Sequence, residues 1–183
     1  PADLSLNARA TSLPPAANFH LYKPCNLACR FCFATFRDVR GRLPTAEALQ
    51  LITELAAAGV DKLTFVGGEP TLHPDIAPLL QHAKDLGLVT CLVTNGARLD
   101  ALLDTCASAI DWVGLSVDSS SESVQAALGR GTGDHVQRSL ALAARCHDLN
   151  IGLKLNSVIT ALNWHEDMSA LVRTMRPHRW KAF

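Results

Sequence analysis

The chain has 183 residues, a length that suits one domain, and 48% of them are hydrophobic, which excludes a disordered chain. Its formal net charge is zero, so a broad basic surface for nucleic acid is excluded, although a small anionic ligand needs only a few clustered basic residues. No apolar run is long enough to predict a transmembrane helix, and no signal peptide is recognisable. We therefore expect a cytoplasmic domain with no membrane segment and no direct nucleic-acid binding.

Strand and helix patterns alternate along the chain after an N-terminal arm or linker at 1–17, and 18–183 are predicted to form one domain. Strands are predicted at 18–23, 62–66, 88–94, 112–117, 151–159 and 179–183, and helices at 45–58, 74–87, 98–107, 122–128, 134–149 and 166–175. Short connections and apolar strands predict a parallel sheet with helices outside it, as an open doubly wound sheet or a partial barrel. In both folds, ligands bind at the carboxyl ends of the strands.

Three cysteines, Cys25, Cys29 and Cys32, follow the first predicted strand. This spacing on a tight loop lets three thiolates point at one place. Three thiolates fill three irons of a 4Fe–4S cluster and leave the fourth iron open for another ligand. A structural zinc site is the alternative, but it needs four ligands, and neither His20 nor His73 has a suitable spacing.

The other cysteines, Cys91, Cys106 and Cys146, lie in apolar or helical stretches and are predicted to be buried free thiols. Six cysteines with three clustered indicate a metal site in a reducing compartment rather than a disulfide framework. The seven histidines show no ligand-like clustering and are assigned to surface or supporting positions, and the Trp and Phe residues to the core.

Polar motifs follow the next three predicted strands. Paired glycines in Gly67-Gly68-Glu69-Pro70 allow a ligand to approach the backbone closely, and the glutamate can accept a hydrogen bond from an ammonium group. A plain strand–helix turn is the alternative. Asn95 follows the third strand, and Ser116 and Asp118 lie at the end of the fourth. All of them are expected at the same edge of the sheet.

Basic residues recur on the predicted strands. Lys154 and Asn156 are two residues apart, as are Arg179 and Lys181, and a period of two places each pair on one face. Together with Lys62, these residues would suit a polyanion such as a triphosphate, whereas each base alone is more simply a solvated side chain. The loop 129–133 looks like a phosphate loop but lacks the Lys-Ser/Thr that a P-loop needs, so a flexible interhelical loop is favoured.

Taken together, these motifs resemble the radical S-adenosylmethionine (SAM) superfamily. Phe31 before the third cysteine fits its cluster motif, and residues 67–70 match its SAM-amine motif. The resemblance narrows to the viperin family, from about residue 18 to the last residue. It is carried by segments 18–33, 61–70, 116–119, 129–131, 154–159, 166–168 and 179–183.

The viperin resemblance implies a partial (βα)6 barrel that dehydrates a nucleoside triphosphate, CTP first, with GTP and UTP as other candidates. The product would be the 3′-deoxy-3′,4′-didehydro analogue, an antiviral chain terminator, formed after a 5′-deoxyadenosyl radical removes the ribose 4′-hydrogen. The implied cofactors are a 4Fe–4S cluster and SAM. The implied partners are a flavodoxin- or ferredoxin-type reductant and iron–sulfur loading machinery, and the protein is expected to be a monomer.

Site residues follow from the resemblance by position. Cys25, Cys29 and Cys32 would hold the cluster. Residues assigned to SAM are Phe31, Gly67, Gly68, Glu69, Pro70, Asn95, Ser116 and Arg130. Residues assigned to the nucleotide are Asn18, Lys62, Arg130, Lys154, Asn156, Arg179 and Lys181.

The sequence also departs from the family pattern. Val66 and Val117 replace a serine and a cysteine of animal viperins, and the amphipathic N-terminal helix of those proteins is not seen. We expect the chain to be incomplete at its C-terminus, without the last part of the barrel. Alternative functions are another radical SAM activity, such as peptide modification or the GTP cyclase step of molybdenum-cofactor synthesis, and a non-catalytic iron–sulfur electron carrier.

Overall fold

The computed structural model describes residues 14–34 and 41–183. Its single sheet contains six parallel strands, each hydrogen-bonded to the next in chain order. The strands are β1 (Ala16–Tyr22), β2 (Lys62–Gly67), β3 (Val89–Thr94), β4 (Trp112–Ser116), β5 (Gly152–Ser157) and β6 (Arg179–Ala182). The helices are α1 (Thr45–Ala57), α2 (Ile76–Asp85), α3 (Leu99–Cys106), α4 (Glu122–Ala127), α5 (His135–Asp148) and α6 (Ser169–Met175), with short 3-10 turns η1 (Pro70–Leu72) and η2 (Ala107–Ala109).

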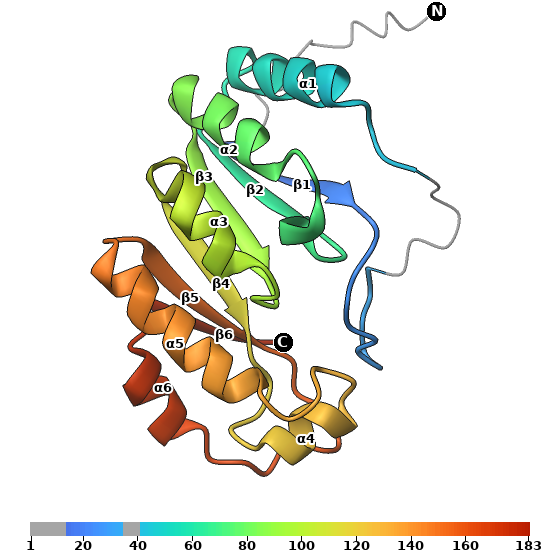
Figure 1. Cartoon of the computed structure of the whole chain (residues 1–183), viewed down its shortest axis with the longest axis vertical. Coiled ribbons are helices and arrows are strands. Elements are labelled where there is room, and N and C mark those ends of the chain that lie inside the picture. The colour runs from blue at the N-terminus through green and yellow to red at the C-terminus, as the bar shows by residue number, and fades with distance from the viewer. Residues whose placement is uncertain (1–13, 35–40) are drawn as a thin grey trace, which may run out of the picture.

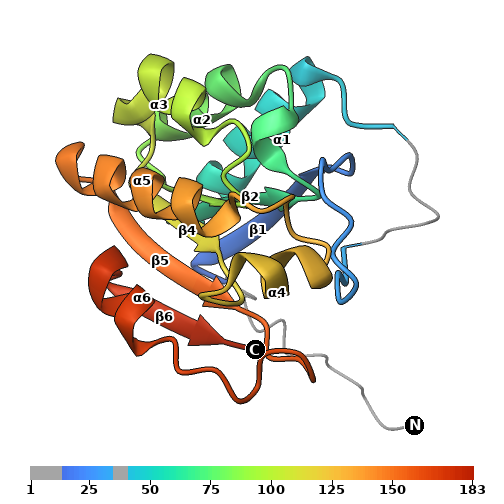
Figure 2. The same ribbon diagram turned by 60° about the horizontal axis from the view of Figure 1, so that its bottom comes forward.

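The sheet is curved, and the helices other than α4 lie along its outside (Figures 1 and 2). Helix α4 instead lies beyond the carboxyl end of β4 (Figure 1). A doubly wound sheet reverses its strand order at a switch point, and this sheet does not. The sequential order confirms the partial (βα)6 barrel and removes the doubly wound alternative.

Alternating side chains divide the sheet into two faces. On β2 and β5, Leu63, Phe65, Leu153 and Leu155 are completely buried and belong to the apolar core that the helices share. Removal of this apolar surface from water is the main stabilising contribution to such a fold. The residues between them point to the opposite, inner face, and on β5 these residues, Lys154 and Asn156 among them, are partly exposed. The inner face is therefore available for polar side chains.

The predicted elements are present, with corrections at their ends. The helix predicted at 166–175 begins only at Ser169, because Glu166 is held in the loop before it. The Glu166 carboxylate accepts hydrogen bonds from the Ser119 hydroxyl, and the backbone N–H of Glu166 donates to the Asn163 carbonyl. The helix predicted from residue 74 begins at Ile76, and the turn η1 before it was not predicted.

The exposure of the cysteine, tryptophan, phenylalanine and histidine side chains can be compared with the predictions from the sequence. Cys91, Cys106 and Cys146 are buried free thiols, which confirms their assignment. The placement of all Trp and Phe residues in the core is wrong, because Phe33 and Trp164 are 83% and 71% exposed. Surface and supporting positions both occur among the histidines, and His73 and His135 are buried.

Strand β1 begins within the predicted arm. Ala16 and Ala17 pair with Lys62 and Leu63, two residues before the predicted start of the domain. Residues 1–13 of the arm lie outside the described residues, so the division into arm and domain stays a prediction. Within the described ranges, no helix has the length and apolar character to cross a membrane.

Candidate cofactor and substrate site

The predicted cofactor residues lie around the carboxyl ends of the first four strands. The cysteine loop, residues 25–32, follows β1, the Gly67–Pro70 segment follows β2, and Asn95 follows β3. The loop after α4, residues 128–133, reaches the same edge and contacts the cysteine loop. Parallel strands bring these segments together although they are distant in the sequence.

Gly67 and Gly68 permit a close approach, but it is made by the chain itself. A Cβ at Gly68 would lie 2.5 Å from the Pro24 carbonyl oxygen, and one at Gly67 would collide with the Tyr22 carbonyl oxygen. The Gly68 and Glu69 N–H groups donate to the carbonyls of Tyr22 and Pro24 at 2.6 and 2.9 Å. The two glycines therefore allow close packing against residues 22–24, the segment that leads into the cysteine loop. For an ammonium group of a ligand, the backbone at these glycines has carbonyl oxygens as hydrogen-bond acceptors.

Glu69 is buried and its carboxylate connects two segments of the site. One oxygen, Oε1, accepts from the Thr71 N–H and from the hydroxyls of Thr71 and Thr94 at 2.6–3.0 Å. The other, Oε2, accepts from the Asn95 N–H at 2.7 Å. The Glu69 carboxylate therefore already accepts hydrogen bonds that connect η1 to the end of β3. If it also accepts from an ammonium group, as the sequence predicts, it must do so in addition to these bonds.

Asn95 contacts the beginning of the cysteine loop. Its Nδ2 donates to Asn26 Oδ1 at 2.9 Å and lies 3.7 Å from the Cys25 sulfur, while its Oδ1 accepts from the Ala97 N–H. The side chain predicted to contact SAM therefore also holds the segment that carries the first cysteine.

Ser116 ends β4 on the inner face, and its carbonyl oxygen is 2.8 Å from Nε2 of the buried His135. A carbonyl only accepts, so Nε2 carries the proton and Nδ1 is free to accept from Arg138. Burial lowers the pKa of His135, and the nearby Arg130 and Arg138 guanidinium groups add to that effect. His135 is therefore a neutral support for the end of β4.

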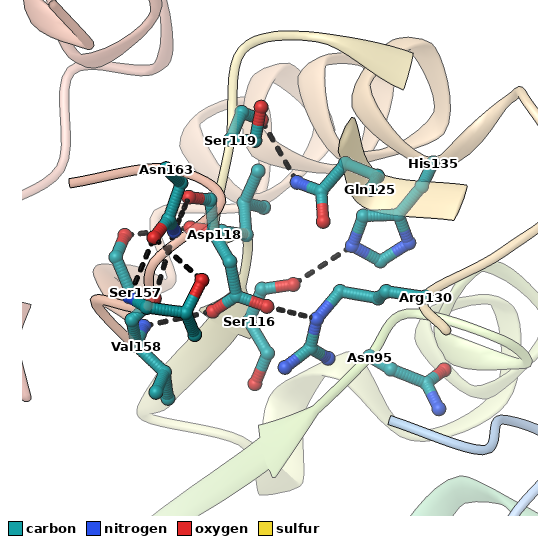
Figure 3. Close-up of polar contacts among 12 residues, drawn as sticks. Asn95, Ser116, Asp118, Ser119, Gln125, Arg130, His135, Ser157, Val158 and Asn163 are labelled. Atoms are coloured by element: carbon teal, nitrogen blue, oxygen red, sulfur yellow. Dashed lines mark hydrogen bonds and ion pairs between the residues drawn. The ribbon is translucent and has the colours of Figure 1, made fainter. Parts of the chain in front are cut away.

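Arg130 lies in a buried polar cluster at the ends of β4 and β5 (Figure 3). Its Nε forms an ion pair with Asp118, and its guanidinium lies 5.4 Å from the centre of the Phe31 ring. The other Asp118 oxygen accepts from the Val158 N–H at 2.8 Å, and Asn163 donates to the Asp118 carbonyl at 2.6 Å. Sequence reasoning placed Asp118 at this edge without a role and missed Asn163. A charged residue directly after an apolar strand was the available signal, since a buried charge needs a partner.

The three cysteines share one loop but differ in burial. Cys25 and Cys32 are exposed and Cys29 is half-buried. Burial raises the pKa of the Cys29 thiol, and the positive charge of Arg130 opposes that shift. Across residues 14–34 and 41–183, no three His, Cys, Asp or Glu side chains are arranged to hold a metal ion. The donor set nevertheless fits an iron–sulfur cluster with one open iron, since three thiols stand on one loop at the ligand-binding edge.

The basic residues predicted to bind nucleotide share the inner face of the sheet. In the strand register, Lys154 is opposite Arg179 and Asn156 is opposite Lys181, with Ser116 in the same row. Asn18 pairs with Thr64, two residues after Lys62 on β2. The structure therefore places all six predicted nucleotide residues other than Arg130 on one face.

Lys154 is the best-defined member of this group. Its Nζ lies 4.7 Å from the centre of the Trp112 ring and 3.9 Å from the Cys91 sulfur. Burial lowers the pKa of Lys154, and contact with Lys62 and the charge of Lys181 lower it further. Ammonium groups from β2, β5 and β6 thus converge, an arrangement that a bound polyanion would stabilise.

Sequence comparison identifies relatives whose names agree with a site for SAM and a nucleotide. The chain is 39% identical to an S-adenosylmethionine-dependent nucleotide dehydratase of Lacinutrix mariniflava over 185 residues, which covers 95% of the chain and 39% of that relative. It is 41% identical to a protein of the same name from Flammeovirga pacifica, over 92% of the chain and 62% of the relative. These names confirm the resemblance seen in the motifs, and the chain spans about two fifths to three fifths of these relatives.

Solved structures support the fold. The crystal structure of SuiB of Streptococcus suis bound to S-adenosylmethionine superimposes with a TM-score of 0.76 at 21% identity, covering 93% of this chain and 39% of that one. The Radical SAM superfamily matches residues 21–173. The chain therefore belongs to the radical SAM superfamily, whose members use a 4Fe–4S cluster and SAM.

Proposed function

We propose that this chain is the barrel of a SAM-dependent nucleotide dehydratase that acts on a nucleoside triphosphate, with CTP as the first candidate and GTP and UTP as the others. The observation that carries the proposal is the row of basic side chains on the inner face, around Lys154. The names of the two relatives support the same reaction class.

Cys25, Cys29 and Cys32 would hold the cluster, and the Gly67–Glu69 segment, Asn95, Ser116 and Phe31 would surround SAM. When bound, these cofactors supply the 5′-deoxyadenosyl radical that removes the ribose 4′-hydrogen. The protein's own contribution is to position the substrate and to exclude water, since the cofactor supplies the difficult chemistry.

The inner face would bind the triphosphate. Charge-assisted hydrogen bonds to phosphate contribute roughly 1.5–3 kcal/mol each, so Lys62, Lys154, Arg179 and Lys181 could together orient the nucleotide strongly. Asn18 and Asn156 lie on the same face and would contribute neutral hydrogen bonds. Loss of the 3′-hydroxyl and the uptake of one electron and one proton would then give the 3′-deoxy-3′,4′-didehydro nucleotide, the antiviral chain terminator.

The test uses the full-length protein, reconstituted anaerobically with iron and sulfide. SAM, dithionite and each of CTP, GTP and UTP are added in turn, and 5′-deoxyadenosine and nucleotide products are followed by mass spectrometry. A nucleotide-dependent increase in 5′-deoxyadenosine, with a product lighter by one water, is expected. The same assay on Lys154→Met should lose most of this response. Lys84→Met is its control, because Lys84 lies on α2 and pairs with Asp111.

The other outcomes identify the rivals. SAM cleavage that is indifferent to nucleotide would reject the substrate and favour another radical SAM activity. A loaded cluster that neither binds nor cleaves SAM would favour an electron carrier.

The cellular setting is proposed on chemical grounds. Three buried free thiols among the described residues suit a reducing compartment, which supports a cytoplasmic location. The reaction needs an electron, so a flavodoxin- or ferredoxin-type reductant and iron–sulfur loading machinery are proposed partners, and a monomer is the proposed state. Sedimentation of the reconstituted full-length protein would test that state.

A further inference from the structure

The loop that follows α4 is hydrogen-bonded to the cysteine loop on both sides of one cysteine. The Ala28 N–H donates to the Gly129 carbonyl at 3.3 Å, and the Arg30 N–H donates to the Leu128 carbonyl at 3.0 Å. Cys29 lies between these two contacts. The backbone around this cysteine is therefore held by a segment about a hundred residues later in the chain.

Gly129 makes this contact possible. Its φ is +82°, a conformation that residues with a Cβ rarely adopt. A Cβ at this position would also collide with the Ala28 carbonyl oxygen and lie 3.2 Å from the Cys29 Cα. Both the backbone conformation and the available space at this position therefore favour glycine.

The side chain of Arg130 adds a second contact with the cysteine loop and joins it to the polar cluster around Asp118, which Figure 3 shows. Its guanidinium lies over Phe31 in the cysteine loop and pairs with the buried Asp118 at the end of β4. Asp118 is itself fixed by the Val158 N–H and by Asn163. Buried ion pairs contribute little net stability because both charges lose water, so a role in placing the loop explains this pair better than stability does.

We propose that Leu128–Arg130 and Asp118 form a clamp that fixes Cys29 for cluster binding. Arg130 is then a positioning residue for the cysteine loop, in addition to any contact it makes with a ligand. The inference concerns how the cluster is held, so it does not depend on which substrate the enzyme takes.

The test measures how fast each cysteine reacts with iodoacetamide in the cluster-free, reduced full-length protein, by peptide mass spectrometry. The variant is Gly129→Ala and its matched control is Gly133→Ala. Gly133 lies in the same loop with φ +114°, but a Cβ there has nothing within 4 Å. Both changes strain the backbone and neither alters charge, so the difference between them reports the collision with the cysteine loop.

In Gly129→Ala, the half-buried Cys29 should react about tenfold faster than in the wild type, as overpacking of a close contact opens the loop locally. Gly133→Ala should change this rate by less than about twofold. The buried Cys91, Cys106 and Cys146 report global unfolding and should stay unreactive in both variants. Equal Cys29 rates in the two variants would overturn the clamp.

If Gly129→Ala unfolds the protein, Arg130→Lys decides the question. This variant keeps the positive charge but loses the planar group over Phe31, so Cys29 should react about threefold faster if the clamp exists. An unchanged rate overturns the proposal and leaves Arg130 with a ligand-binding role alone.

A second measurement follows the cluster itself. After identical anaerobic reconstitution, Gly129→Ala should retain less iron per chain than Gly133→Ala and should show a broadened EPR spectrum of the reduced cluster. Equal iron content and identical spectra would contradict a positioning role for the clamp.

Discussion

At the scale of single residues, Glu69 connects the turn η1 to the end of β3 through one buried carboxylate. Glu69→Gln replaces one oxygen by an NH2 group, which would face a donor such as the Asn95 N–H and leave it unpaired. A buried unpaired group costs about 1–3 kcal/mol, and we expect this loss in the free energy of unfolding, measured with urea on the cluster-free protein.

Glu54→Gln is the control, because Glu54 accepts from Gln50 on the exposed surface of α1. This change should alter the stability by less than about 0.5 kcal/mol. Equal losses in the two variants would show that the Glu69 carboxylate is not a structural connector.

His135 is expected to make stability depend on pH. Its pKa is lowered by burial and by Arg130 and Arg138, with the hydrogen bond to the Ser116 carbonyl and the charge of Asp118 opposing, whereas the unfolded value is 6.5. Between the lowered pKa and 6.5 the unfolded chain binds more protons, so the free energy of unfolding falls as the pH falls below 6.5. His135→Gln should flatten this slope in urea titrations between pH 7.5 and 5. The decrease should correspond to at most about one proton taken up on unfolding, since one group has been removed.

The buried His73 has a pKa lowered by the same cause and will contribute a remaining slope in the variant. Gln137→Ala, which changes an exposed side chain that has no titratable group and lies on the same helix, serves as the control and should leave the slope unchanged. A slope that is identical in His135→Gln and wild type would contradict the assignment of His135 as a neutral buried support.

At the scale of elements, the strand register determines the chemistry of the inner face. Lys154→Met on β5 should weaken nucleotide binding by about tenfold to a hundredfold, since one charge-assisted contact is lost. Cluster assembly should survive, because Lys154 lies on the sheet and not in the cysteine loop. Isothermal titration with CTP and iron analysis of the same samples would check both parts, with Lys84→Met as the control.

The lowered pKa of Lys154 adds a second signature. A bound triphosphate favours the charged ammonium and raises that pKa, so binding should take up protons as the pH rises through the lowered value. Titration heats in two buffers of different ionisation enthalpy would reveal this uptake, and it should diminish in Lys154→Met. Unchanged proton uptake in the variant would show that another group titrates.

At the scale of the whole molecule, the apolar core is independent of the cysteine loop. The core includes residues from β1 to β5 and from the helices of the outer layer, but none of Cys25, Cys29 and Cys32. Removal of the cluster with a chelator should therefore leave the far-UV circular dichroism unchanged. Hydrogen exchange should increase only in residues 25–32 and 128–130 and in their neighbours at the strand ends, and faster exchange throughout β2–β4 would contradict this.

The sequence determined much of this protein because its signals are local. Alternating strands and helices predict a parallel sheet with helices outside it, the spacing of Cys25, Cys29 and Cys32 predicts the cluster, and the two-residue period of Lys154 and Asn156 predicts their common face. Each of these patterns lies within one short segment, where backbone geometry relates sequence spacing directly to direction.

The tertiary structure decided what depends on contacts between distant segments. The sequence assigned Gly67 and Gly68 to ligand approach and Gly129–Gly133 to a flexible loop, whereas the glycines at 67, 68 and 129 admit another part of the chain. Asp118 received no role until folding placed it beside Arg130. No spacing within the sequence encodes which segments meet at the carboxyl edge, because the curvature of the whole sheet brings them together.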